Sequence, residues 1–224
     1  MNAILIPVKE LAQAKQRLAA HFSPEQRIAL ADALWQDFFD VVAAVRGVDR
    51  VFVISIEPRV LQRAGRFGWE VIPESRQTSE TDSVDFASRV CAHFGVNALL
   101  RLPVDLPLAG PTDIEGIWRA LPDGHAAVIV PSRDGDGTNA LLRAPPALFP
   151  SHFGPGSFAK HLSEAEQCGA RVQIVRNEKL ETDIDDYDDL RALRGALVAA
   201  PRTRAWLERH GFGKPLARAA GTFR

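Results

Sequence analysis

The sequence predicts a single-domain α/β fold in which helices flank a mostly parallel β-sheet. Short apolar runs alternate with segments whose apolar residues recur at helical spacing, and this alternation is typical of parallel sheets with helical crossovers. With 224 residues, the chain fits one sizeable domain better than two. A hydrophobic content of 46% is enough to build a substantial core.

The first elements follow a strand–helix–strand order. The apolar run Ala3 to Val8 predicts a buried first strand. Ser23 marks the start of a long helix, because Pro24 suits its first turn and Gln26 completes a capping box. Right-handed crossovers then connect the remaining elements of this half, which are strands at 50–56, 69–72 and 98–102, helices at 57–67 and 83–94, and a polar loop at 73–82.

The long helix carries three aromatic residues among its aliphatic ones. Trp35, Phe38 and Phe39 recur at helical spacing, so we expect them in the core or in an interface rather than at a ligand. This apolar helix, together with the C-terminal tail, also suggests a homodimer.

The loop before Thr138 is the first of two glycine-bearing polar loops that fall close together. The apolar run 126–130 predicts a buried strand, and the Asp and Gly residues at 134–137 have the chemistry of a tight turn. Thr138 and Asn139 then stand directly before a second apolar run, 140–142.

The second loop is a Gly-Pro-Gly-Ser turn that leads into a helix. Gly154 and Gly156 allow the backbone to approach a ligand closely, and Ser157 predicts the N-cap of a helix that begins at about Phe158. The start of a helix suits a phosphate or a carboxylate, because its N–H groups are unpaired. The alternative interpretation is a plain connection without a ligand.

Three carboxylates stand where a metal ion could bind. Asp105 follows the strand at 98–102, while Asp183 and Asp185 share one face of an extended segment. Carboxylates on one face repel each other unless a cation or a proton lies between them, so we expect Mg²⁺. The alternative for Asp105 is a loop or capping role. Acidic residues also complement a helix start, and we assign that role to Asp186, Asp188 and Asp189.

Basic residues follow the first strand. Lys9, Lys15 and Arg17 stand beyond its carboxyl end, and ligands of open α/β sheets bind at that edge. A basic loop at this place is suited to a polyphosphate. The alternative is the solvated start of a helix.

The C-terminal part adds three further elements and a tail. Thr112 predicts the cap of a helix that ends near Leu121, and a helix at 158–168 and a strand at 172–175 follow the glycine-bearing turn. From Val198 onward the chain is rich in Arg and carries an exposed-looking Trp206. This segment could be a flexible end, a dimer arm or a flap over the site.

Charge and composition exclude some function classes. A net charge of −1 argues against general electrostatic binding of nucleic acid. We find no run of 18 apolar residues and no signal-peptide pattern, so we expect a cytoplasmic protein without a membrane partner. Cys91 and Cys168 lack metal or redox spacing, and we expect both to be reduced.

Five groups of residues together resemble a known family. In chain order they are IPVK with AKQRLA, LPVDLPL, PSRDGDGTNALL, FGPGSFAKHL and TDIDDYDDL. They resemble the CofC-type guanylyltransferases of coenzyme F420 biosynthesis, over roughly the first 190 residues. The resemblance implies a single nucleotidyltransferase-like (Rossmann-like) catalytic domain, for which we expect residues 1–197, with residues 198–224 as a basic tail or arm.

The resemblance also implies a reaction and its partners. The family transfers GMP from GTP to a three-carbon phosphorylated acid, namely 2-phospho-L-lactate, phosphoenolpyruvate or 3-phospho-D-glycerate, and pyrophosphate leaves. The family's downstream deazaflavin transferase is a further expected partner. Sugar-nucleotide relatives begin with a glycine-rich loop, whereas this chain has IPVKELAQAK there, so the triphosphate must depend more on Lys and Arg.

Site residues follow from the resemblance position by position. The family's substrate-binding Thr, Gly and Ser fall on Thr138, Gly154 and Ser157, and its acidic metal positions fall on Asp105, Asp183 and Asp185. We expect the β- and γ-phosphates of GTP to be bound by the basic residues Lys9, Lys15 and Arg17. We also expect Lys15 and Arg17 to have a catalytic role together with Asp105.

Two other functions remain open at this point. One is a glycosyltransferase that uses a nucleotide sugar, with Asp183-Ile184-Asp185 as its Asp-x-Asp metal motif, although that motif usually follows a middle strand. The other is a non-catalytic module that binds a nucleotide or a phosphorylated acid. A guanylyltransferase releases pyrophosphate, whereas a glycosyltransferase releases a nucleoside diphosphate. Tight binding without Mg²⁺ would favour the non-catalytic module.

Overall fold

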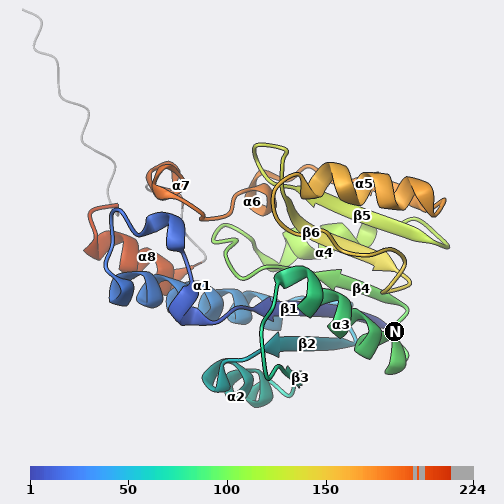
Figure 1. The fold of residues 1–224 in the computed structure, drawn as a ribbon, viewed down its shortest axis with the longest axis horizontal. Helices are drawn as coiled ribbons and strands as arrows, with labels where there is room; N and C mark the ends of the chain where they lie inside the picture. Colours follow the sequence, from blue (N-terminus) through green and yellow to red (C-terminus); the bar gives the residue numbers. More distant parts are fainter. Residues whose placement is uncertain (194–195, 197–199, 213–224) are drawn as a thin grey trace, which may run out of the picture.

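One β-sheet organises the molecule (Figure 1). A computed structural model describes residues 1–193, 196 and 200–212. Within these residues the sheet has seven strands in the order β3-β2-β1-β4-β6-β5-β7. Their bounds are β1 (Asn2–Val8), β2 (Arg50–Ser55), β3 (Glu70–Pro73), β4 (Ala98–Arg101), β5 (Ala126–Pro131), β6 (Thr138–Ala144) and β7 (Arg171–Ile174).

The sheet is mostly parallel, which confirms the predicted fold class. Strand β1 pairs in parallel with β2 and β4, while β6 runs antiparallel to both β4 and β5. Because β6 is reversed, its amino end lies at the edge of the sheet where the neighbouring strands have their carboxyl ends. Thr138, the first residue of β6, therefore reaches the ligand-binding edge.

Helices cover both faces of the sheet (Figure 1). Alternation along β1 places Ile4 and Ile6 in a core with α1, α2 and α4, and Leu5 in a second core with α3. Helix α5 packs on β5 and β7. The helix bounds are α1 (Pro24–Ala43), α2 (Pro58–Arg66), α3 (Glu80–His93), α4 (Pro111–Arg119), α5 (Ser157–Gln167), α6 (Glu178–Glu181), α7 (Tyr187–Ala192) and α8 (Pro201–Arg209).

Helix starts agree with the sequence only in part. The capping box of Ser23 and Gln26 is present as predicted. Thr112 is not a cap, because Gly110 takes that place and its N–H donates to the Asp113 carboxylate at 3.0 Å. Helix α3 begins three residues before the predicted Ser83, since the Ser79 hydroxyl accepts a hydrogen bond from the Asp82 N–H.

The start of α5 differs from the prediction by one residue. Ser157 is the first residue of the helix and not its cap, and it is buried. The cap is Gly156, whose left-handed backbone (φ 69°) is a conformation that favours glycine. This shift by one residue turns Ser157 inward instead of leaving it at the surface.

The segment after residue 200 packs on the body of the protein. Helix α8 lies beside α1 (Figure 1), and Trp206, which looked exposed from the sequence, is 5% exposed with its Nε1–H donating to the Gln26 carbonyl at 3.1 Å. Arg202 forms ion pairs with Asp37 and Asp40. The expected boundary between residues 197 and 198 lies outside the described residues, as does the rest of the tail, 213–224.

The aromatic residues of α1 belong to the core. Trp35, Phe38 and Phe39 are each less than 5% exposed within the single chain, so they do not support the expected homodimer interface. In the described part of the chain, no helix has both the length and the apolar character needed to cross a membrane.

Candidate active site

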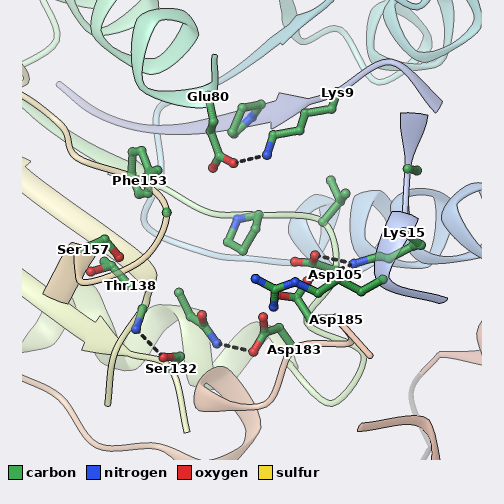
Figure 2. A pocket seen from close by; sticks show the side chains of 18 of the residues that line it. Lys9, Lys15, Glu80, Asp105, Ser132, Thr138, Phe153, Ser157, Asp183 and Asp185 are labelled. Carbon is green, nitrogen blue, oxygen red and sulfur yellow. Dashed lines mark hydrogen bonds and ion pairs between the residues drawn. The ribbon is translucent and has the colours of Figure 1, made fainter. Parts of the chain in front are cut away.

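A cleft of about 1080 Å³ opens at the carboxyl edge of the sheet. All nine residues that the sequence singled out line this cleft, namely Lys9, Lys15, Arg17, Asp105, Thr138, Gly154, Ser157, Asp183 and Asp185. Figure 2 shows the carboxylates Asp105, Asp183 and Asp185 on one side of the cleft and Thr138 and Ser157 on the other. The cleft is large enough for two small ligands side by side.

Lys15 lies at the centre of the acidic side. Its Nζ is 2.6 Å from Asp105 Oδ2 and 3.8 Å from Asp185 Oδ1, and it donates to the carbonyl of Ile184. Between the short 3-10 helices η1 (Leu11–Gln13) and η2 (Gln16–Leu18), its backbone adopts the left-handed conformation with φ 53°. Among described non-glycine residues this positive φ is unique, and such strain often marks a functional position.

The segment from Asp183 to Asp185 is fixed to the loop that follows β4. The Ile184 N–H donates to the Asp105 carbonyl at 3.1 Å, and the Ile184 side chain is fully buried. The side chains of Asp183 and Asp185 both line the cleft, as the alternation predicted. Asn139 Nδ2 donates to Asp183 Oδ1 at 3.2 Å, which links this segment to β6.

The clustered carboxylates change one another's protonation. Burial, with the charges of Asp105 and Asp185, raises the pKa of Asp183 to about 6. Burial also acts to raise the pKa of Asp105, but the adjacent Lys15 ammonium and the charge of Arg101 together outweigh it, and the net pKa is lowered. Lys15 in turn has a raised pKa, because the attraction of these carboxylates exceeds the effect of burial. The acidic side therefore retains negative charge despite the lysine.

The remaining acidic residues have the predicted structural role. Asp186 caps α7, accepting hydrogen bonds from the N–H groups of Asp188 and Asp189. Asp189 completes the capping box and forms an ion pair with Arg133 at 2.9 Å. Arg17 pairs with Asp185 at 3.2 Å and is otherwise exposed, so it can move to another anion.

Lys9 does not join Lys15 and Arg17. Its Nζ is 2.9 Å from the carboxylate of Glu80, at the start of α3 (Figure 2). The other oxygen of Glu80 pairs with Arg101, a residue that the sequence reasoning missed. The Arg101 side chain is buried, its guanidinium lies 4.1 Å from the centre of the Phe153 ring, and its Nε has no hydrogen-bond partner among the described residues.

The two glycine-bearing loops are joined to each other. Asp136 accepts a hydrogen bond from the Gly156 N–H at 2.9 Å, and its carbonyl accepts one from the Phe158 N–H at 3.1 Å. Gly137 is closely packed, because a Cβ there would lie 2.9 Å from the Ser132 hydroxyl. Gly154 has φ 117°, which disfavours any other residue. The turn and the start of β6 thus form one polar wall of the cleft.

Comparison with known proteins agrees with this arrangement. The family model described as "Guanylyl transferase CofC like" matches residues 2–212. The chain belongs to this guanylyltransferase family. It is 37% identical over 202 residues to the phosphoenolpyruvate guanylyltransferase of Rubrobacter xylanophilus, covering 88% of this chain and 97% of that protein. It is 31% identical over 186 residues to the 2-phospho-L-lactate guanylyltransferase of Methanothermobacter thermautotrophicus, covering 83% and 81%.

Solved structures support the same fold. A nucleotide-diphospho-sugar transferase from Desulfovibrio desulfuricans superposes with a TM-score of 0.73 at 14% identity, covering 93% of this chain and 97% of that one. A nucleotidyl transferase from Methanothermobacter thermautotrophicus gives 0.61 at 15% identity, covering 87% and 96%. These structures confirm the expected nucleotidyltransferase-like fold, while the nucleotidyltransferase class of the enzyme rests on the family match.

Proposed function

We propose that this chain transfers GMP from GTP to a small phosphorylated carboxylic acid, with release of pyrophosphate. The observation that carries the proposal is the two-sided cleft, with a carboxylate cluster around Lys15 facing a polar wall built from Thr138 and the Gly154–Ser157 turn. Two anionic reactants must meet in such a reaction, and the two sides offer a separate place for each.

Positioning and charge neutralisation supply most of the catalysis in this scheme. An oxygen of the acid's phosphate attacks the α-phosphorus of GTP in line, the bond to the β-phosphate breaks, and pyrophosphate leaves. The attacking phosphate is already ionised, so no general base is needed. Lys15 and Arg17 bind the phosphates of GTP, while Thr138 and the backbone of the Gly154–Ser157 turn bind the acid. Lys9 and Arg101 add positive charge beside the acid.

We further propose that the acidic side holds Mg²⁺ on Asp105, Asp183 and Asp185. Carboxylate oxygens are the ligands that Mg²⁺ prefers, and the pKa of about 6 at Asp183 reflects a negative charge that a divalent cation would offset. In the described residues no three such side chains already surround a common point, because Lys15 Nζ lies between Asp105 and Asp185. When bound, the metal would neutralise phosphate charge. Lys15 would then be free to pair with a phosphate.

We propose phosphoenolpyruvate as the first acceptor to test. Relatives at 37% and 34% identity, from Rubrobacter xylanophilus and Conexibacter woesei, are phosphoenolpyruvate guanylyltransferases. The guanylylated acid would pass to a downstream deazaflavin transferase in coenzyme F420 biosynthesis. We also propose a cytoplasmic location, with which the absence of a disulfide between Cys91 and Cys168 in the described structure is consistent.

Pyrophosphate release tests the proposal. The purified protein is incubated with Mg²⁺ and GTP, ATP or CTP, and with phosphoenolpyruvate, 3-phospho-D-glycerate or 2-phospho-L-lactate in parallel. We expect acid-dependent release with GTP only. Release of a nucleoside diphosphate from a nucleotide sugar would support the glycosyltransferase instead, and tight metal-independent binding without turnover would support the binding module.

A further inference from the structure

His161 is a buried histidine that touches the acid side of the cleft. It lies in the second turn of α5 and is 0% exposed, with its ring packed edge-on against Phe153 at a centroid distance of 5.1 Å. Its Nδ1 is 3.0 Å from the hydroxyl oxygen of Thr138, and its Nε2 is 2.8 Å from the backbone nitrogen of His152. Both ring nitrogens therefore have a partner.

These two partners determine which nitrogen carries the proton. A backbone N–H can only donate, so Nε2 of His161 must accept from His152. A neutral imidazole has one N–H, which is then on Nδ1. The ring stays neutral at ordinary pH, because burial, together with the nearby Arg143 and Arg101, lowers the pKa of His161 to about 3.

The proton on Nδ1 fixes the direction of the next hydrogen bond. Nδ1–H of His161 donates to the Thr138 oxygen, so the hydroxyl hydrogen of Thr138 is left for another acceptor. Thr138 lines the cleft, where an anionic oxygen of a ligand would be that acceptor. With the opposite tautomer, Thr138 would donate to His161 and present lone pairs to the anion, which would repel it.

We propose that His161 is a positioning residue that makes the Thr138 hydroxyl a hydrogen-bond donor to an anionic oxygen of the phosphorylated acid. This inference rests on the proposed function, which places the acid at Thr138. The hydrogen bonds form a directional series from the His152 N–H through His161 and Thr138 to the ligand, and each bond polarises the next. The effect acts on acid binding and leaves GTP binding unchanged.

Two substitutions of His161 separate donation from packing. In His161→Asn the side-chain amide can place an N–H where Nδ1 stands. In His161→Gln the amide reaches the position of Nε2 and can accept from His152, but Thr138 loses its donor. We expect His161→Gln to raise the KM for the acid by roughly 10-fold to 100-fold with the KM for GTP unchanged. The KM of His161→Asn for the acid should stay within about 3-fold of the wild-type value, as should that of the exposed control His125→Gln.

A double-mutant cycle with Thr138→Val tests whether His161 acts through the hydroxyl. If it does, adding His161→Gln to Thr138→Val raises the acid KM no further. Fold-changes that multiply would show a separate structural effect and overturn the inference. If Thr138→Val raises the acid KM but His161→Gln does not, the inference fails and the proposed function stands. If Thr138→Val itself changes nothing, the proposed acid site fails as well.

NMR spectroscopy measures the tautomer of His161 directly and does not require a variant with enzymatic activity. The two-bond ¹H–¹⁵N spectrum of ¹⁵N-histidine-labelled wild-type protein reports the tautomer of His161, whose signals are assigned by their absence in His161→Asn. We expect the proton on Nδ1, at pH 7, with and without phosphoenolpyruvate. A proton on Nε2 would overturn the inference even if the variants were inactive.

Discussion

Lys15 and Asp105 are the closest charged pair on the acidic side, with 2.6 Å between Nζ and Oδ2. Lys15 is 10% exposed, and Asp185 at 3.8 Å is its second partner. Because all three groups depend on one another, a change at Asp105 alters both the binding of a cation and the placement of Lys15.

Asp105→Asn keeps the shape of the side chain and removes its charge. We expect turnover to fall on the order of 1,000-fold, because loss of one charged ligand removes several kcal/mol of transition-state stabilisation. The circular dichroism spectrum should be unchanged. Asp123→Asn is the matched control, since Asp123 is exposed and precedes β5 at the opposite edge of the sheet. Near-normal turnover of Asp105→Asn with Mg²⁺ would exclude Asp105 as a metal ligand.

The buried His161 should also make the free energy of unfolding depend on pH. Its pKa is about 3 in the folded state, below the ordinary value of 6.5, so between these pH values the unfolded chain binds more protons. Neutral His161 therefore makes its full contribution to the free energy of unfolding above pH 6.5. This contribution decreases as the pH falls below that value, by up to about 1.4 kcal/mol per pH unit.

Urea unfolding of the wild type and of His161→Asn at several pH values from 7.5 to 5 measures this contribution. We expect the free energy of unfolding of the wild type to fall more steeply than that of the variant on acidification. Other titrating groups cancel in the difference between the two proteins. A difference that does not vary with pH would mean that His161 is protonated as easily in the folded state as in the unfolded chain.

At the scale of elements, α8 is part of the folded body. Asp37 accepts hydrogen bonds from the backbone N–H groups of Arg202 and Thr203, which fixes the first turn of α8 against α1. Trp206 and Leu207 then pack with residues of α1 and α7 in one apolar cluster. The same cluster contains Ile184, the residue between Asp183 and Asp185.

Trp206→Ala should therefore destabilise the protein. We expect the free energy of unfolding to fall by about 3–5 kcal/mol, as for a large buried aromatic side chain. Denaturant unfolding measures the change, and Arg204→Ala, on the exposed side of the same helix, should cost less than about 0.5 kcal/mol. Equal and small effects of both substitutions would indicate an undocked tail.

At the scale of the whole molecule, sequence patterns predicted the strands and the edge at which the ligands bind. Asp105 reaches that edge because it follows the buried strand β4, and Asp183 and Asp185 lie beside it because the Ile184 N–H donates to the Asp105 carbonyl. The apolar residues of β6 predicted a strand but carry no signal for its direction, which decides where Thr138 lies. The burial of Trp206 could not be predicted, because polar residues outnumber apolar ones in the short, Arg-rich helix α8.

Contacts between distant polar side chains were beyond sequence reasoning. Lys15 meets Asp105 only through the left-handed turn at its own backbone, which no residue type there predicts. Arg101 could have been suspected, because a lone Arg in the apolar run ALLRL must be buried and paired. The tautomer of His161 depends on a backbone N–H from another loop and has no sequence signal.

Following the phosphorus atoms of GTP distinguishes guanylyl transfer from other reactions of the nucleotide. The protein is incubated with Mg²⁺ and phosphoenolpyruvate, or with the acid that supports release, and with GTP labelled at either the α- or the γ-phosphate. The downstream transferase and its deazaflavin acceptor trap the product. We predict that the α-label, together with the guanosine, becomes attached to the acid while the γ-label leaves as pyrophosphate. Transfer of the γ-label to the acid, or release of GDP, would contradict guanylyl transfer.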